Sequence, residues 1–328
     1  MDIVDFTVLV LPGAQSASVA TTLDLLSAAA RLAVGSAAPC PRWRVRSPAG
    51  GTVQLQGGMH LAATLCLPQR RIDRTSLWIV PGLGVARPDA LAARLAEQDA
   101  LRAAAALRSH VAHGGAVAAS CSAVFLLAQA GLLDGRRATT AWWLAPALQR
   151  RAPAARIDAD HMVLSDGGLH TAGAAHAQAD LMLHLLRLRC GPALADRVAR
   201  MLLLDARSAQ APFVVPALLA AGDALLDRLT TRLENALPHP PRMAALALEF
   251  GMSARTLVRQ VRAATGHGPL VLLQRVRLQR ARQLLAQSRM GVEEVAAAVG
   301  FQDATALRRL SRRMLGAPPS RLRPPVPR

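Results

Sequence analysis

The chain has 328 residues, of which 52% are hydrophobic, so it has room for two domains and wholesale disorder is excluded. All 39 basic residues are arginine; residues 240–328 hold 16 of them beside four acidic residues, a net charge of +12, against +6 for residues 1–239. This excess predicts a phosphate-binding surface in the C-terminal part of the chain. Nucleotide composition would explain arginine in place of lysine, but not the shortage of acids.

The four cysteines, Cys40, Cys66, Cys121 and Cys190, are widely separated and form no CxxC pair. This spacing is typical of a reduced cytoplasmic protein. The N-terminus carries acids where a signal peptide has positive charge. The uncharged run from Gly115 to Leu133 is long enough to span a bilayer, but its small residues and its β-like first half predict a buried strand, turn and helix. We therefore predict a cytoplasmic protein with no membrane partner.

Strand-like and helix-like patterns alternate through the first 120 residues. The first apolar run ends at Pro12-Gly13, as in a central parallel strand, and a later one ends in the same way at Pro81-Gly82. This alternation indicates a doubly wound, flavodoxin-like α/β domain. The predicted strands are Phe6 to Leu11, Trp43 to Ser47, Val53 to Gln56, Leu77 to Val80 and Ala116 to Ala119, and the predicted helices are Ala17 to Leu32 and Asp89, as a cap, to Ala112.

In such sheets a ligand binds at the carboxyl ends of the strands. The strand ends place Gly13, Gly82, Cys121 and Ser122 at this edge, and we predict that they line an effector pocket. Cys121 lies where a strand passes abruptly into a helix, a geometry that exposes a nucleophile and directs helix N–H groups at it. A thiol there is expected to have a lowered pKa. The alternative is a small buried cysteine at the start of a helix.

The rest of this domain adds a hairpin and a helix. Asp158 to Thr171, with its turn at Asp166-Gly167-Gly168, predicts the hairpin, and Ala174 to Arg189 predicts the helix. The histidines have no Cys, Asp or Glu at metal-ligand spacing, so we predict surface or core-edge histidines, no metal site and no cofactor. Prolines between Ser208 and Pro216 interrupt the helical pattern, and we place the boundary there, with domains at 1–210 and 211–328.

Two stretches near the C-terminus, Ala245 to Pro269 and Glu294 to Pro319, are copies of one unit. Leu257/Leu307, Arg259/Arg309, Gly266/Gly316 and Pro269/Pro319 are each 50 residues apart, whereas Gly251 and Gly300 are 49 apart. In each copy a helical run ends at a glycine, which tolerates the left-handed turn between two helices, and a second helix follows. The predicted unit is a helix-turn-helix, present twice.

The second helix of each unit has one apolar and one basic face. Ser253 is expected to cap the first of these helices, with Leu257 and Val261 facing inward. Two such helices fit two turns of a DNA major groove, about 34 Å apart. The alternative is a helical bundle with a solvated basic face. The predicted DNA contacts are Ser253, Arg255, Thr256, Arg259, Arg262, Thr305, Arg308, Arg309 and Arg312.

The segment from about Asp223 to Arg323 resembles the AraC/XylS type of DNA-binding domain, through MSARTLVRQVRAATGHGP and VEEVAAAVGFQDATALRRLSRRMLGAPPSRLR. The resemblance implies seven helices, recognition helices at Ser253 to Thr265 and Asp303 to Leu315, and a long connecting helix that includes Arg275 to Gln287. Leu307, Ser311 and Leu322 stand where that family often has aromatic residues.

The first part, roughly Asp5 to Leu188, resembles the PfpI-like domain of the class I glutamine-amidotransferase-like superfamily, through VLVLPGA, WIVPGLG and GGAVAASCSAVFLLAQAGLLDGRRATTAWW. Together the two resemblances are to the GlxA family of transcriptional regulators. In enzymes of the superfamily the elbow cysteine, here Cys121, works with an acid and often a histidine. Ser18, Ser122 and Ala141 stand where relatives carry such groups, so we predict no catalytic residue.

The leading hypothesis is a sequence-specific regulator of double-stranded DNA, a homodimer, whose first domain senses a small molecule or dimerises. The rival hypothesis is a cysteine hydratase or amidase with an accessory nucleic-acid-binding domain. A third is that the first domain is a dimerisation scaffold without a ligand.

Overall fold

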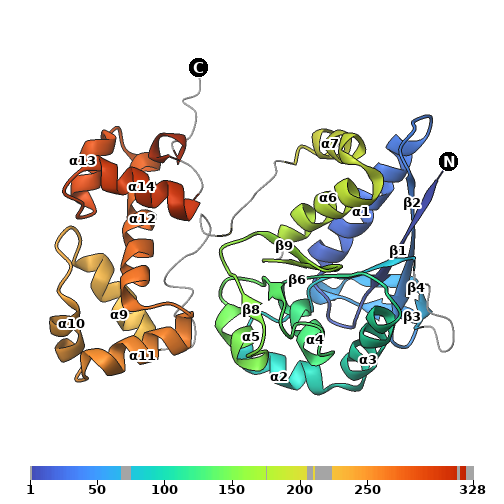
Figure 1. Ribbon diagram of the computed structural model, residues 1–328, viewed down its shortest axis with the longest axis horizontal. Helices are drawn as coiled ribbons and strands as arrows, with labels where there is room; N and C mark the ends of the chain where they lie inside the picture. The colour runs from blue at the N-terminus through green and yellow to red at the C-terminus, as the bar shows by residue number, and fades with distance from the viewer. Residues whose placement is uncertain are drawn as a thin grey trace. The chain divides into compact units, whose positions relative to one another are not determined.

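The computed structural model describes residues 2–67, 75–174, 176–204, 210, 224–315 and 318–322. By its internal contacts the chain divides into two compact units, residues 1–208 and 209–328 (Figure 1). The predicted boundary between Ser208 and Pro216 lies outside the described residues except for Gln210. None of the helices in the described ranges combines the length and the apolar character that a bilayer crossing needs.

The described strands of the first unit are β1 Ile3–Leu9, β2 Cys40–Ser47, β3 Gly51–Gln54, β4 His60–Cys66, β5 Leu77–Val80, β6 Val117–Ser120, β7 Arg137–Ala138, β8 Arg156–Ile157, β9 Val163–Asp166 and β10 Leu169–Ala172. Eight of them form one sheet in the order β3-β4-β2-β1-β5-β6-β10-β9, and β7 pairs with β8. The centre of the sheet is parallel, and the antiparallel pairs β3/β4 and β9/β10 lie at its edges. The chain leaves β1 toward β2 on one side and reaches β5 on the other, so the strand order reverses beside β1.

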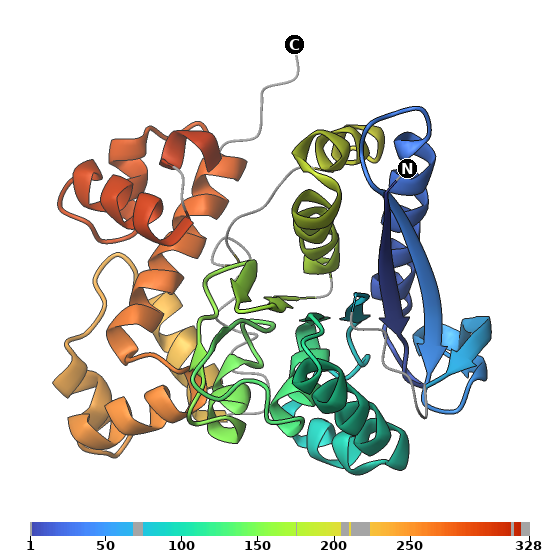
Figure 2. The same ribbon diagram turned by 45° about the vertical axis from the view of Figure 1, so that its right-hand side comes forward.

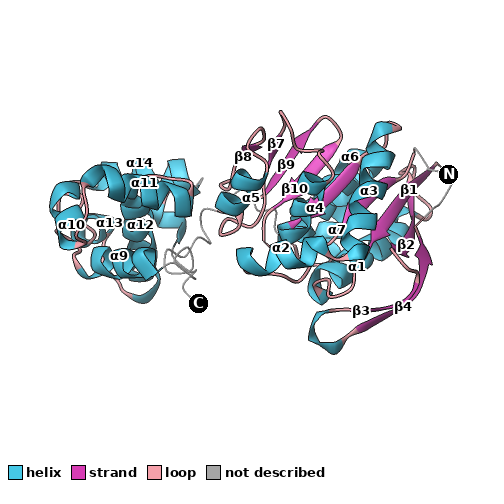
Figure 3. Ribbon diagram, turned by 90° about the horizontal axis from the view of Figure 1, so that it is seen from below, coloured by secondary structure: helices cyan, strands magenta, loops and turns pink. Residues whose placement is uncertain are grey.

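The helices of this unit are α1 Ser16–Ala33, α2 Pro88–Ala96, α3 Gln98–Ala112, α4 Val124–Gln129, α5 Ala145–Arg151, α6 Ala177–Cys190 and α7 Pro192–Met201, with short 3₁₀ helices η1 Gln56–Gly58 and η2 Cys121–Ala123. They cover both faces of the sheet (Figures 1 and 3). Leu77 and Ile79 of β5 pack with α1, α6 and α7, whereas Trp78 and Val80 pack with α2 to α5. Because both faces are covered, the central strands are apolar without interruption. The predicted doubly wound α/β fold is confirmed.

A long-range hydrogen bond joins the two ends of this unit. The Gln178 side-chain amide in α6 donates to Thr22 Oγ1 in α1 at 2.8 Å, across 156 positions of sequence, and both residues are fully buried. The bond helps hold α6 against α1 on one face of the sheet.

Most predicted elements of this unit lie close to their observed bounds, and Leu77–Val80 matches at both ends. The single helix predicted from Asp89 to Ala112 was wrong. Glu97 has an extended backbone (φ −66°, ψ 147°) and separates α2 from α3, and Asp89 lies in the first turn of α2 rather than at its cap. The predicted hairpin is confirmed, with Gly167 and Gly168 both at positive φ between β9 and β10.

The second unit is helical where it is described (Figure 2). Its elements are α9 Ala224–Asn235, α10 Met243–Glu249, α11 Ala254–Thr265, α12 Pro269–Gln287, α13 Val292–Ala298, α14 Ala304–Leu315 and the 3₁₀ helix η4 Pro319–Leu322. The described residues thus contain six α-helices and one 3₁₀ helix where the resemblance implied seven helices. α11 and α14 coincide to within one residue with the helices predicted as recognition helices, and α12 contains the predicted connecting helix.

Two separate apolar clusters form the core of this unit, one for each helix-turn-helix. The first holds Leu257 and Val261 of α11, and the second holds Leu307 and Leu310 of α14. α12 contributes to both, with Leu272, Leu273 and Val276 in the first and Leu278, Ala281 and Leu285 in the second. Ser311, in place of the aromatic residue usual in relatives, is fully buried beside the second cluster.

Each helix-turn-helix turns at a glycine with positive φ, Gly251 (+67°) and Gly300 (+84°). A Cβ at Gly251 would meet no atom within 4 Å. A Cβ at Gly300 would lie 2.1 Å from the Pro238 carbonyl oxygen, so the chain before α10 passes against the second turn.

Replacement of these glycines by alanine tests this difference. Gly251→Ala should lower the free energy of unfolding of the first helix-turn-helix by about 1 kcal/mol, because an alanine in the left-handed region costs about that much. Gly300→Ala should cost about 2 kcal/mol more, because backbone atoms must also move. Hydrogen exchange of amides in α10 to α14, measured by mass spectrometry, gives both values. Equal costs at the two positions would contradict the close approach at Gly300.

Candidate functional site

α11, the first of the two predicted recognition helices, begins as the sequence predicts. Ser253 Oγ accepts the Thr256 N–H at 3.1 Å and lies 2.9 Å from Thr256 Oγ1, which makes Ser253 the cap. Gly266, in the left-handed region, ends the helix. The cap satisfies an N–H that the helix itself leaves unbonded, and so fixes the residue at which α11 starts.

The two faces of α11 differ sharply. Leu257 and Val261 are buried in the apolar cluster, whereas Arg255, Arg259 and Arg262 are exposed. Within the described part of the chain, none of these three arginines has a carboxylate or another hydrogen-bonding partner. α11 therefore presents three guanidinium groups with all their donors available, a pattern that suits base edges and phosphates.

α14, the second predicted recognition helix, is also capped at its start and also has an exposed basic face, but its hydrogen-bond partners differ. Asp303 Oδ1 accepts the Ala306 N–H at 2.8 Å, and this bond holds the pKa of Asp303 below its usual value. Thr305, Arg309 and Arg312 are exposed. Arg308 is also exposed, but its Nη2 lies 2.7 Å from Glu293 Oε1 of α13. An exposed pair of this kind contributes about 0–1 kcal/mol, so Arg308 can leave it at low cost.

The same kind of contact occurs at the turn before α11 and at the turn before α14, and the sequence analysis missed it. The Arg228 guanidinium of α9 lies 5.3 Å from the centre of the Phe250 ring, and Arg277 of α12 lies 4.9 Å from that of Phe301. Each phenylalanine adjoins the glycine of its turn, Gly251 or Gly300. The position of an aromatic residue beside each glycine was the available signal. Cation–π contacts here tie the helix before each unit to its turn.

In the first unit, the carboxyl ends of β1, β5 and β6 converge as predicted. The Gln15 N–H, just after β1, donates to the Gly82 carbonyl at 2.8 Å, and the Leu83 N–H donates to Ser122 Oγ at 3.0 Å. A Cβ at Gly82 would lie 3.4 Å from Cys121 Cβ and 3.3 Å from Gln15 Oε1. Gly82, Cys121 and Ser122 are thus together and buried, and Gln15 is a neighbour that the sequence analysis did not name.

Gly13, the fourth predicted pocket residue, is exposed beside this group. Its carbonyl oxygen would lie 2.1 Å from a Cβ at Gly84, so the segment after β5 passes directly against it. The four predicted residues therefore lie on neighbouring segments at one edge of the sheet, with Gly13 on the solvent side.

Cys121 has the predicted elbow geometry. Its φ is +52°, in a region that costs a non-glycine residue about 1–2 kcal/mol. Its backbone is held on both sides: its N–H donates to the Gly173 carbonyl at 2.8 Å, and its carbonyl accepts from Thr140 Oγ1 at 2.7 Å. The strained turn is thus fixed by hydrogen bonds from two other segments.

The predicted lowering of the Cys121 pKa was wrong. Burial raises the pKa of this thiol to about 11, because the side chain is only 6% exposed and a thiolate would lose its water. Hydrogen bonds from Ser122 act in the opposite direction and are weaker. The helix that follows starts as the three-residue η2, so few aligned N–H groups face the sulfur.

No partner for acid–base chemistry contacts this thiol within the described residues. Ser18, near the place of the acid in relatives, is fully buried and lies 3.2 Å from Gln15 Oε1, and Ala141 is fully buried as well. The same ranges contain no cluster of three or more His, Cys, Asp and Glu side chains able to hold a metal ion.

Of the histidines predicted at the surface or the edge of the core, His110 is fully buried instead and stacks on Trp78 with ring centres 4.7 Å apart. His170 and His184 both lie 2.8 Å from Ser165 Oγ through one ring nitrogen each. Burial, with a smaller contribution from His184, lowers the pKa of His170 to about 4.

Comparison with known proteins supports the domain type predicted for each half of the chain. Residues 5–188 match the DJ-1/PfpI family model, and residues 246–324 match a helix-turn-helix domain model. The HTH-type transcriptional regulator CdhR of Pseudomonas aeruginosa is 30% identical over 329 residues, which cover 98% of this chain and 92% of CdhR. The HTH-type transcriptional regulator GlxA of Rhizobium meliloti is 33% identical over 211 residues, which cover 62% of this chain and 63% of GlxA, slightly under two thirds of its length.

Two solved structures show the fold of the first unit. An AraC family transcriptional regulator from Pseudomonas putida has a TM-score of 0.52 and 24% identity, covering 61% of this chain and 99% of its own. Drosophila melanogaster DJ-1beta has a TM-score of 0.50 and 22% identity, covering 62% of this chain and 100% of its own.

The raised pKa of Cys121 makes its reactivity testable. At pH 8 a pKa of about 11 leaves about 0.1% thiolate. Iodoacetamide should therefore modify Cys121 at least about 100-fold more slowly than the exposed Cys66, and the rate should rise about tenfold per pH unit toward pH 11. Peptide mass spectrometry measures both rates, with urea-unfolded protein as the control. Equal labelling of the two cysteines in the folded protein would restore the low-pKa hypothesis.

Proposed function

The chain belongs to the DJ-1/PfpI-containing family of HTH-type transcriptional regulators, and we propose that it regulates transcription by reading double-stranded DNA with α11 and α14. One observation carries this proposal: two capped helices, 50 residues apart, each bury an apolar stripe and expose a row of arginines. If these helices served only to pack in a helical bundle, there would be no reason for both of them to expose a row of arginines. Two recognition helices on one connecting helix suit successive turns of the major groove.

Within this proposal some of the arginines contact bases and others contact phosphates. Arg255 and Arg259 lie one turn apart on the exposed face of α11, where each can hold a guanine edge through two hydrogen bonds. Arg262 and Arg312 lie nearer the C-terminal ends of their helices and are proposed to contact phosphate. Further proposed DNA contacts are Ser253, Thr256, Thr305, Arg308 and Arg309.

Alanine variants separate these tasks. Arg255→Ala and Arg259→Ala should each relax base preference at one position, a loss of about 1–3 kcal/mol of discrimination. Arg262→Ala and Arg312→Ala should weaken binding to all sequences and lower the salt slope of log K by about one. Selection of bound fragments from random DNA, followed by titrations at several salt concentrations, gives both quantities. Unchanged selection by a folded Arg255→Ala, Arg259→Ala double variant would remove α11 from the readout.

The two domains are proposed at 1–210 and 211–328, with the first sensing an effector or holding a homodimer together. The internal contacts and separate apolar cores of the two units support this division. The effector site is proposed at the edge of the sheet lined by Gly13, Gly82, Cys121 and Ser122, where the strand order reverses beside β1.

A fragment of residues 211–328 tests the division. It should give a helical circular dichroism spectrum and select the same DNA sequence as the full chain. Its affinity should be lower if the first domain joins two chains, because dimerisation makes the second binding event intramolecular. A helical fragment that does not bind would mean that the boundary or the function is wrong.

The first domain is proposed to act without catalysis. The thiol of Cys121 is protonated at neutral pH, and no acid or imidazole contacts it among the described residues. A buried thiol without a proton-transfer partner gives little help to hydration or amide hydrolysis. Hydratase, amidase or glyoxalase turnover by purified protein that is lost in Cys121→Ser would contradict this part of the proposal.

A further inference from the structure

Arg308 differs from the other arginines proposed to contact DNA, because it has a carboxylate partner. Its Nη2 lies 2.7 Å from Glu293 Oε1, and this pair joins α14 to the first turn of α13. The other five form no ion pair or hydrogen bond with any residue that the structure describes; they are Arg255, Arg259, Arg262, Arg309 and Arg312. Arg308 is therefore presented to DNA in a different state.

The pair of Arg308 and Glu293 carries no net charge at neutral pH. The pKa of Glu293 is held below its usual value by its own backbone N–H first and by Arg308 second, so its carboxylate is ionised. An arginine without such a partner attracts phosphates of any sequence through its positive charge. Glu293 cancels that charge, and its carboxylate repels phosphate oxygens. Arg308 is thus less suited to a phosphate than the unpaired arginines are.

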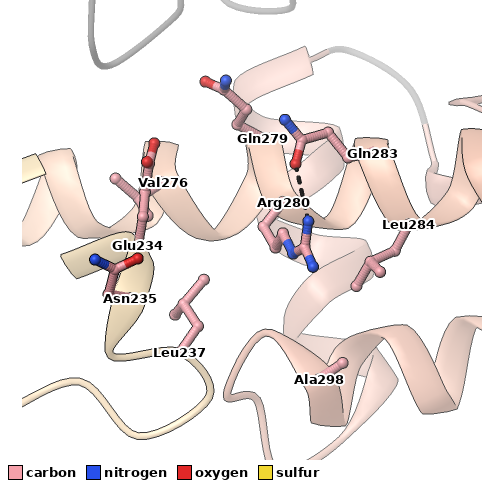
Figure 4. A pocket seen from close by; sticks show the side chains of 9 residues that line it. All are labelled: Glu234, Asn235, Leu237, Val276, Gln279, Arg280, Gln283, Leu284 and Ala298. Atoms are coloured by element: carbon pink, nitrogen blue, oxygen red, sulfur yellow. Dashed lines mark hydrogen bonds between the residues drawn. The ribbon is translucent and has the colours of Figure 1, made fainter. Parts of the chain in front are cut away.

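Two other arginines of the second unit have neutral partners and keep their charge. Arg280 of α12 donates to Gln283 Oε1 at 3.3 Å, as Figure 4 shows. Arg313 of α14 donates to Gln274 Oε1 at 3.2 Å. An amide oxygen orients a guanidinium but leaves its positive charge in place. A carboxylate does both, because it orients the guanidinium and also neutralises it.

The pair still leaves Arg308 able to read a base. A guanidinium has five N–H donors, of which the bond to Glu293 uses one, and a guanine edge needs two. Arg308 also lies in the N-terminal half of α14, the part of a recognition helix that reaches base edges. Its side chain is 44% exposed, so its remaining donors are open to a ligand. The carboxylate restricts the direction in which those donors point.

We infer that Glu293 is a positioning residue for Arg308 and makes it a base reader rather than a phosphate contact. Arg308 holds a guanine edge in the groove bound by α14, while Glu293 stays bonded to it and turns its free donors toward the base. This inference rests on the proposed function, because it concerns DNA recognition. It divides α14 between Arg308, which reads sequence, and Arg312, which is proposed to contact phosphate.

The experiment is selection of bound fragments from random DNA by the full chain, followed by titrations at several salt concentrations. Arg308→Ala should lower the preference for guanine at one position about fivefold or more. Glu293→Gln keeps the shape of the side chain but removes its charge. It should lower the preference at the same position about two- to fivefold. It should also steepen the salt slope of log K by about one, because the freed guanidinium reaches a phosphate.

Glu294→Gln is the matched control. Glu294 is the neighbouring acid, and its Oε2 accepts the Gly291 N–H at 2.5 Å to cap α13. A glutamine retains such a cap, so the variant removes the same charge one residue away and leaves the partner of Arg308 in place. It should have the base preference of the wild type. Its salt slope gives the effect of the charge alone, to be subtracted from that of Glu293→Gln.

The double variant Glu293→Gln, Arg308→Ala tests whether Glu293 acts through Arg308. It should have the base preference of Arg308→Ala, so that the two changes are not additive. Additive losses, or losses at two different positions of the DNA, would overturn the inference. Wild-type preference at every position in Glu293→Gln would overturn it as well.

A measurement without DNA separates this inference from the proposed function. NMR relaxation of the arginine Nε–H groups should show Arg308 more restrained than Arg309 in the wild type, and as mobile as Arg309 in Glu293→Gln. Equal mobility in the wild type would overturn the inference even if the protein selects DNA. A wild-type chain that selects no DNA sequence, with Arg308 restrained, would refute the proposed function and with it the role of Arg308.

Discussion

The second unit depends on one constraint: α12 is buried on two sides by two different cores. Its first half packs with α11 through Leu272, Leu273 and Val276, and its second half packs with α14 through Leu278, Ala281 and Leu285. Since a helix rises about 1.5 Å per residue, the 19 residues of α12 span about 28 Å. This length sets the separation of the two helix-turn-helix motifs rigidly. The exposed arginines of α11 and α14, the proposed DNA contacts, are held at a fixed spacing by this helix.

In the first unit, burial determines the protonation state of the Cys121 thiol. Cys121 stands at a strained elbow, a position that in other proteins exposes a nucleophile, yet here the surrounding segments close over it. The Leu83 N–H donates to Ser122 Oγ, and Thr140 Oγ1 donates to the Cys121 carbonyl, so two other segments are bonded to the turn that carries the sulfur. The same backbone geometry therefore gives a protonated, shielded thiol, and the local turn alone does not determine its reactivity.

Features of this protein that depend on neighbouring residues in the sequence could be predicted, whereas features that depend on distant segments could not. Both ends of the strand Leu77–Val80 were predicted correctly, because a strand that is buried on both faces of a sheet has an uninterrupted run of apolar residues. The cap of α11 was predictable because a serine, Ser253, stands at its start, and the faces of α11 and α14 were predictable because their apolar residues repeat at a helical period. β4 was missed, since polar and apolar residues do not alternate along its sequence, HLAATLC. The pKa of Cys121 depends on segments that meet only in the folded chain, so the spacing of residues in the sequence does not reveal it.

The bond between Thr22 and Gln178 has a consequence for the order in which the chain folds. The central strand β1 is synthesised first, but the α6 face that covers it ends near residue 190, so this unit has long loops to close before its core is complete. The second unit makes its two cores from segments close in sequence, and contacts of that kind form quickly. On the ribosome, the slow-closing sheet thus emerges before the fast helical unit. Until α6 has been synthesised and has packed against α1, one face of the apolar strands of this sheet is incompletely covered, and such exposed strands favour aggregation.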